Sequence, residues 1–112
     1  MVLVDGGTRN NFPTDIAKAV GADYIIGIEQ SDLMPEYNEV NNIGDIIMQF
    51  FTMLSTDAYN KNVSTPDVFI KPDLQGYNML SFSDQAVDSM IVRGYEAAKA
   101  KTDELLNLKS KL

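Results

Sequence analysis

The strongest constraint on the fold is a set of short apolar runs rich in β-branched residues. They lie at residues 2–4, 24–28 and 68–70. Continuous runs of this kind are typical of strands covered on both faces, as in parallel sheets. Each run is followed by a segment with helical features, which gives the order β-α-β-α-β-α. This alternation predicts an α/β fold with a parallel sheet and helices on its faces.

The first two helices are predicted from their ends and their apolar spacing. Thr14 is a plausible N-cap for a short helix over residues 15–20, and Gly21 is expected to end it. A second helix is expected from residue 43 to about residue 59, where apolar residues recur at helical spacing. The polar segment 29–42, which contains a proline, is expected to be a loop.

A third helix is expected to begin near Ser81 and to continue to the C-terminus. Ser81 and Asp84 have the spacing of a capping box, in which each side chain bonds the other residue's backbone N–H. The stripe expected to be buried on this helix consists of Val87, Met90, Ile91, Tyr95, Ala98, Leu105, Leu108 and Leu112.

Composition excludes several classes of function. The sequence has neither His nor Cys, so Ser–His–Asp and Cys–His catalysis and Cys/His zinc sites are excluded within the chain. The formal net charge is −7 and the basic residues are scattered, which argues against nucleic acid as a partner. No signal peptide and no transmembrane run of ~18 apolar residues is recognisable. The compartment stays open, with a cytoplasmic or membrane-peripheral location favoured over secretion.

Asp5 is the candidate catalytic residue. It follows the first apolar run and precedes Gly6 and Gly7. Ligands of open α/β sheets bind beyond the carboxyl ends of the strands, where this order places Asp5. The two glycines allow close backbone approach or a positive φ. By itself the tripeptide indicates only a turn, because Asp-Gly is a common turn pair.

The longer segment around Asp5 resembles the catalytic-Asp region of the patatin-like phospholipases. In that family a strand ends in Asp-Gly-Gly or Asp-Gly-Ala, and an Asn-x-Pro turn, a short helix, Gly-Ala-Asp and another apolar strand follow. The matching pieces here are Asp5-Gly6-Gly7, Asn10-Asn11-Phe12-Pro13, Gly21-Ala22-Asp23 and residues 24–28. Residues 66–74 and 82–106 are similar to later parts of bacterial members, so the resemblance spans nearly the whole chain.

The resemblance implies a serine acyl hydrolase with a Ser–Asp dyad and no His. Asp5 would accept the serine proton and later activate water. The turn around it would be supported by four residues, Gly6, Gly7, Asn11 and Pro13. The implied substrate is a lipid or acyl ester, with phospholipids, lysophospholipids and simple esters all left open. No cofactor and no metal is implied.

The nucleophilic serine of the family is absent from the sequence. None of the serines lies in Gly-x-Ser-x-Gly, and no Gly-rich oxyanion loop is present. We therefore interpret residues 1–112 as a single domain or fragment, the C-terminal portion of a patatin-like domain, with both missing elements expected upstream of Met1. The chain on its own is expected not to hydrolyse esters.

The alternative function is that of a non-catalytic patatin-like remnant that binds a partner or itself. Homo-oligomers are expected to form through the sheet edge at residues 2–4. Residues 46–54 are unusually apolar for an amphipathic helix. The simpler interpretation is a helix packed on the sheet, and the functional one is a lipid-facing or self-association surface.

Two further patterns are weaker. Asn62-Val63-Ser64 is a formal glycosylation sequon, which we interpret as coincidental because no secretory signal accompanies it. Several acids could together suggest a hard-cation site, but their spacing is not that of known ligand sets, and solvated acids are the favoured interpretation. These acids are Asp5, Asp15, Asp23, Glu29 and Asp32.

Overall fold

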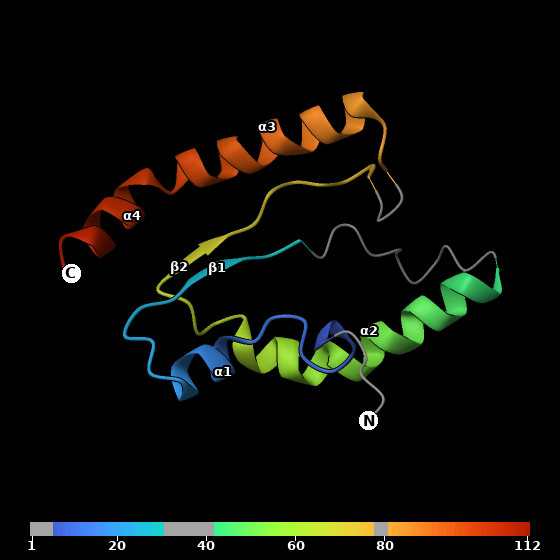
Figure 1. Cartoon of the computed structure of the whole chain (residues 1–112), viewed down its shortest axis with the longest axis horizontal. Coiled ribbons are helices and arrows are strands. Elements are labelled where there is room, and N and C mark those ends of the chain that lie inside the picture. The colour runs from blue at the N-terminus through green and yellow to red at the C-terminus, as the bar shows by residue number, and fades with distance from the viewer. Residues whose placement is uncertain (1–5, 31–41, 78–80) are drawn as a thin grey trace. The chain divides into compact units, whose positions relative to one another are not determined.

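The computed structural model describes residues 6–30, 42–77 and 81–112 (Figure 1). These residues form a mixed α/β fold with a two-stranded parallel sheet. The predicted strand at residues 2–4 lies outside the described residues, so the full β-α-β-α-β-α topology stays a prediction. In chain order the elements are the 3₁₀ helix η1 (Gly6–Thr8), α1 (Thr14–Ala19), β1 (Ile26–Ile28), α2 (Ile43–Asn62), β2 (Val68–Ile70), α3 (Asp84–Ala100) and α4 (Thr102–Lys109).

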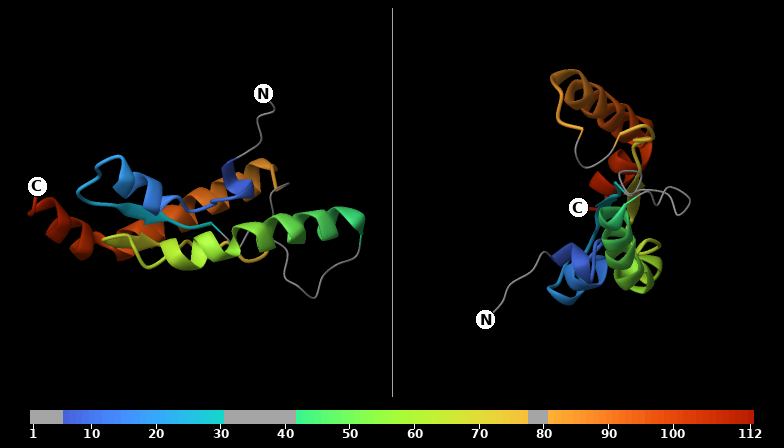
Figure 2. Two further views of the ribbon diagram at one scale, coloured as in Figure 1. Left: turned by 90° about the horizontal axis from the view of Figure 1, so that it is seen from below. Right: turned by 90° about the vertical axis from the view of Figure 1, so that its right-hand side faces the viewer.

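The described residues fall into two compact units. The first holds η1, α1 and α2, and η1 lies against α2 (Figure 2). The second holds β1, β2, α3 and α4. Each unit combines segments that are distant in the sequence, because the chain leaves the first unit for β1 and returns to it for α2.

The start of α1 differs from the prediction. The helix begins at Thr14 and its N-cap is Pro13, so the assignment of Thr14 as the cap is wrong. The reason is a tertiary hydrogen bond, since the Thr14 hydroxyl donates to the carbonyl of Asn62 at 2.9 Å. Thr14 is also buried, so its side chain serves packing between the two helices rather than the first turn of its own helix.

The end of α1 agrees with the prediction. Gly21 has a φ of 96°, a conformation that side chains with a Cβ disfavour. Its N–H donates to the carbonyl of Lys18 at 3.0 Å, and the N–H of Ala22 donates to the carbonyl of Ala17 at 3.1 Å. This pair of bonds is the Schellman motif, which ends a helix by bonding its last free carbonyls.

Replacing Gly21 by Ala is expected to destabilise the first unit by ~1–2 kcal/mol, because an L-residue with a Cβ is strained at this φ. Gly6→Ala is the matched control, since Gly6 has no positive φ and a Cβ there would meet no atom within 4 Å. Urea denaturation of both variants measures the difference. Equal losses in the two variants would contradict the assigned role of Gly21.

The helix predicted over residues 43–59 is confirmed as α2, which continues to Asn62. A capping box opens it: the side chain of Asn42 accepts from the N–H of Asp45 at 3.1 Å, and the Asp45 carboxylate accepts from the N–H of Asn42 at 3.1 Å. The expected burial of its apolar face is not observed. Six of its apolar side chains are more than half exposed, namely Ile43, Ile46, Ile47, Phe50, Met53 and Leu54.

The sheet of the second unit is formed by β1 and β2. Val68–Ile70 is a strand as predicted, and β1 is shorter than the predicted run at residues 24–28. The register pairs Ile26 with Val68 and Ile28 with Ile70. Ile26 and Ile28 are exposed, so the prediction that the strand at residues 24–28 is covered on both faces is wrong. Only the side of β1 that carries Gly27 is buried.

The predicted third helix is interrupted and becomes two helices, α3 and α4 (Figures 1 and 2). The chain leaves helical geometry at Lys101. There the hydroxyl of Thr102 donates to the carbonyl of Lys99 at 2.6 Å, a local bond that competes with the helical ladder. Ser83, rather than Ser81, is the N-cap of α3, and its hydroxyl accepts from the N–H of Ala86 at 3.3 Å.

The core of the second unit is small. Leu108 of α4 is buried against Val68 and Ile70 of β2, and Ala97, Ala98 and Leu105 pack against this cluster. The rest of the predicted stripe is less buried, and Val87, Ile91, Tyr95 and Leu112 are exposed. Among the helices of the described ranges, none is both long and apolar enough to cross a membrane.

Candidate functional site

The predicted site residues lie in the segment that enters α1. Asp5 lies outside the described residues. Gly6 and Gly7 open η1, and the exposed residues Asn11 and Pro13 belong to the loop before α1. Gly6 has no positive φ and faces open space, so the special need for a glycine expected there is not observed.

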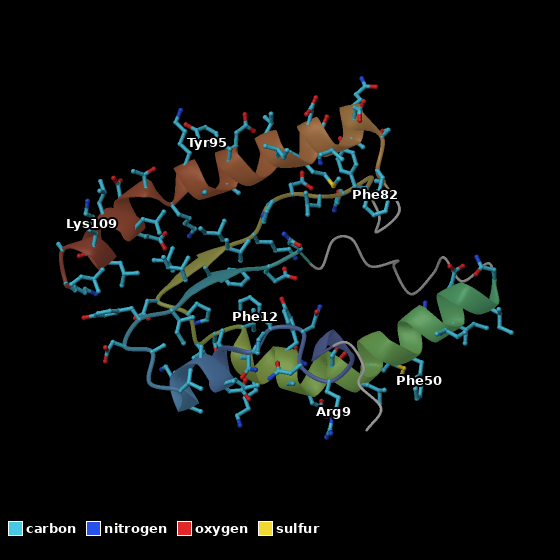
Figure 3. The ribbon with its side chains drawn as sticks, viewed as in Figure 1. Arg9, Phe12, Phe50, Phe82, Tyr95 and Lys109 are labelled. Atoms are coloured by element: carbon cyan, nitrogen blue, oxygen red, sulfur yellow. The ribbon has the colours of Figure 1, made fainter. Side chains whose placement is uncertain are left out.

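The turn that directly follows Asp5 is closed by two backbone hydrogen bonds. The N–H groups of Arg9 and Asn10 both donate to the carbonyl of Gly6, each at 3.1 Å. The exposed side chain of Arg9 points away from η1 (Figure 3). The first residues of the motif therefore form a compact turn that presents Arg9 to solvent.

A network of three polar side chains holds this turn. The Asn10 amide donates to Asp15 Oδ1 at 2.9 Å. The Asn62 amide donates to the same Asp15 oxygen at 2.8 Å and to Asn10 Oδ1 at 3.2 Å. The three residues come from the motif loop, the first turn of α1 and the end of α2. Asn62 is only 1% exposed, so the network is anchored in the interior of the first unit.

Two further contacts support the same arrangement. The carbonyl of Asn62 is one of the last carbonyls of α2, which lack helical partners, and it accepts from the Thr14 hydroxyl. Phe12 is buried, and its ring meets Tyr59 of α2 edge to face at a centroid distance of 6.1 Å. The loop before α1 is thus held to α2 by both polar and aromatic contacts.

The electrostatics of the network favour an ionised Asp15. The hydrogen bond from Asn10 lowers the pKa of the Asp15 carboxyl below its ordinary value, and the bond from Asn62 acts in the same direction, while desolvation opposes both. A general base works best with a pKa near the operating pH. Asp15 is therefore suited to accept structural hydrogen bonds, and not to take protons at neutral pH.

Sequence reasoning did not connect Asp15 with Asn62. In the sequence Asn62 stands out as part of a sequon, whereas in the structure its side chain is buried and hydrogen-bonded to two partners. A glycan attached to that nitrogen would have to displace both bonds, which agrees with the interpretation of the sequon as coincidental. The only local signal for its role is a polar amide at the end of an apolar helix.

The buried carboxylate of Glu29 forms an ion pair with Lys71. It follows β1, and Lys71 follows β2, so the parallel register brings the two residues side by side. The Glu29 carboxylate lies 3.2 Å from the Lys71 ammonium group, and the Glu29 side chain is buried. Asp32, like Asp5, lies outside the described residues. Within the described ranges, no group of three or more potential metal ligands occurs.

An open hollow of about 360 Å³ lies in the second unit. Arg93 of α3 borders it, and its guanidinium donates to the carbonyls of Asp73 at 2.9 Å and Gln75 at 3.2 Å. The same group lies 5.0 Å from the centroid of the Tyr77 ring. These contacts hold the loop after β2 to α3, which accounts for Arg93 without a ligand.

No protein-family model matches the chain. The assignment of Asp5 therefore rests on the resemblance carried by residues 5–28 and stays a prediction. The turn that follows Asp5 is the best-supported candidate site, because its hydrogen bonds join three segments of the first unit.

Proposed function

We propose that residues 1–112 form the C-terminal part of a patatin-like serine acyl hydrolase in which Asp5 is the base of a Ser–Asp dyad. One observation supports this best. The segment after Asp5, which carries the resemblance, is a closed turn whose Asn10 side chain is bonded to both α1 and α2. A catalytic carboxylate must be held in place, and a turn fixed in this way suits that demand.

The chemistry requires a serine from a segment that precedes residue 1. A serine hydroxyl is a weak nucleophile until a neighbouring base accepts its proton. Asp5 would take that proton as the hydroxyl attacks the ester carbonyl, and would pass it to the departing alcohol as the acyl-serine forms. It would then take a proton from the water that attacks the acyl-serine, and would return it to the serine oxygen as the acid is released. Backbone amides of a Gly-rich loop would stabilise the oxyanion. The substrate class is a lipid or another acyl ester.

The first experiment is to sequence the reading frame upstream of the codon for Met1. A frame that encodes a Gly-rich loop followed by Gly-x-Ser-x-Gly supports the proposal. The longer protein and the 112-residue chain are then compared on a short-chain nitrophenyl ester and on phosphatidylcholine. We expect hydrolysis only by the longer protein. A stop codon directly upstream, or hydrolysis by the 112-residue chain itself, would contradict the proposal.

A second candidate function is self-association, in which the partner is another copy of this chain. It is favoured by the exposed apolar side chains of α2, among them Phe50, which is 58% exposed and points away from the helix (Figure 3). Exposed apolar surface of this kind marks interaction sites in soluble proteins. The sheet edge predicted at residues 2–4 lies outside the described residues.

Phe50→Lys is expected to weaken self-association on the order of 30-fold, because a central aromatic side chain can contribute about 2 kcal/mol or more to an interface. Light scattering after size exclusion, at two concentrations, measures the change. Tyr95→Lys is the matched control, since Tyr95 is an aromatic residue of α3 that is 67% exposed. A chain that is monomeric at both concentrations would exclude this function.

A further inference from the structure

Asn62 lies far in sequence from the motif loop but contacts it directly. We infer that Asn62 is a positioning residue, which holds the turn after Asp5 through Asn10 and Asp15. Its effect on catalysis rests on the proposed function of Asp5. The hold on the turn does not, and it can be tested in the chain without any reaction.

The first step of the argument is the saturation of the Asn62 amide. An Asn side chain offers two N–H groups. Both are engaged, one with Asp15 Oδ1 at 2.8 Å and the other with Asn10 Oδ1 at 3.2 Å, in partly buried hydrogen bonds. Asn10 also donates to Asp15 Oδ1 at 2.9 Å, which closes a ring of three side chains. The Asn10 side chain is therefore fixed through both its oxygen and its nitrogen.

The second step connects Asn10 to the motif. The backbone N–H of Asn10 donates to the carbonyl of Gly6, the residue next to Asp5, at 3.1 Å. A continuous path of hydrogen bonds thus runs from the end of α2 through Asn10 to Gly6. Small errors in the placement of a catalytic group have large effects, and a misplacement of about 1 Å can lower a rate ~100-fold.

A purely local role at the end of α2 makes a different prediction. The carbonyl of Asn62 accepts from the Thr14 hydroxyl and from the N–H of Thr65, and neither bond needs the Asn62 side chain. If the amide served only the helix end, its loss would affect the N–H of Val63, which bonds Tyr59, and would leave the turn unchanged.

The test is amide hydrogen exchange, measured by NMR on the 112-residue chain. In Asn62→Ala, the N–H groups of Arg9 and Asn10 are expected to exchange about tenfold faster, since the loss of two partly buried hydrogen bonds weakens the hold on the turn. Exchange at Val63 is expected to change little. Asn60→Ala is the matched control, because Asn60 is an exposed residue of the same type on the same helix.

A reciprocal pair of variants covers the case in which Asn62→Ala fails to fold. Asn62→Asp places a second carboxylate next to that of Asp15 and is expected to speed amide exchange at Arg9 and Asn10. Asp15→Asn combined with Asn62→Asp restores one donor and one acceptor, in reversed order, and is expected to recover most of the protection at Arg9 and Asn10. Unchanged exchange in Asn62→Asp, or no recovery in the double variant, overturns the inference.

The catalytic readout is made in the longer protein. Asn62→Ala is expected to lower kcat at least tenfold with little change in KM, and Asn60→Ala is expected to change neither. A freed turn without any Asp5-dependent hydrolysis would refute the proposed function and leave the positioning role intact. If hydrolysis depends on Asp5, but neither kcat nor amide exchange in the turn changes when Asn62 is replaced, only the positioning role would be refuted.

Discussion

Replacing Asp5 by Asn is expected to lower kcat for ester hydrolysis by ~10²–10⁴-fold in the longer protein, the range that a positioned general base contributes. Asn has nearly the shape of Asp but cannot accept the serine proton. The interaction that is lost is made only as the serine attacks, so KM is expected to change little. Initial rates on a nitrophenyl ester, measured over a range of substrate concentrations, separate the two parameters.

The control for this variant makes the same chemical change elsewhere. Asp57 is an exposed residue of α2, and Asp57→Asn is expected to leave kcat unchanged. Circular dichroism checks that both variants are folded. A rate for Asp5→Asn that equals that of Asp57→Asn would show that Asp5 is not the base, whichever serine carries the reaction.

Leu108→Ala is expected to destabilise the second unit by ~2–5 kcal/mol, the usual loss when a buried Leu is truncated. Leu108 is 7% exposed and packs on Val68 and Ile70. That core is small, so few neighbouring side chains can move to fill the cavity. Urea denaturation, followed by NMR signals of β1 and β2, measures the loss within this unit.

Leu106→Ala provides the comparison on the same helix. Leu106 is 58% exposed, and its truncation is expected to change stability by no more than about 0.5 kcal/mol. Both variants gain the same helix propensity from Ala, so the difference between them isolates the packing of Leu108. Similar losses in the two variants would mean that α4 does not stabilise the sheet.

Local pattern was sufficient to predict α2, β2 and the end of α1. Helical spacing identifies Ile43–Asn62, and a positive-φ glycine ends α1 at the predicted position. Local pattern failed where a distant partner decides the outcome. Thr14 has the residue type of an N-cap, yet its hydroxyl bonds the carbonyl of Asn62. The sequence does not indicate the break between α3 and α4 at Lys101. The feature that accompanies the break is one local hydrogen bond, from the Thr102 hydroxyl to the carbonyl of Lys99, and it leaves no pattern in the sequence.

The candidate site was predictable only in part. The motif around Gly6 and Pro13 is contiguous in sequence, so it can be recognised from the sequence. The hydrogen bonds from Asn62 to Asn10 and Asp15 join residues that are 52 and 47 positions apart in the sequence. Contacts between residues so far apart leave no periodic pattern in the local sequence. Exposure of the α2 face was one of two interpretations that the sequence left open, because apolar spacing indicates a helix face without showing what covers it.

The pairing of β1 with β2 has a kinetic consequence. The two strands flank α2 in the sequence, so their parallel ladder forms only after the whole intervening segment has closed into a loop. Long-range parallel pairing of this kind is slow compared with helix formation, because the entropy of loop closure is lost before the strand contacts form. The helices are therefore expected to form first during folding and the sheet last. If a protease cut the connection to α2, the two strands would belong to separate polypeptides and would have to associate. Re-formation of the sheet after denaturation would then depend on protein concentration.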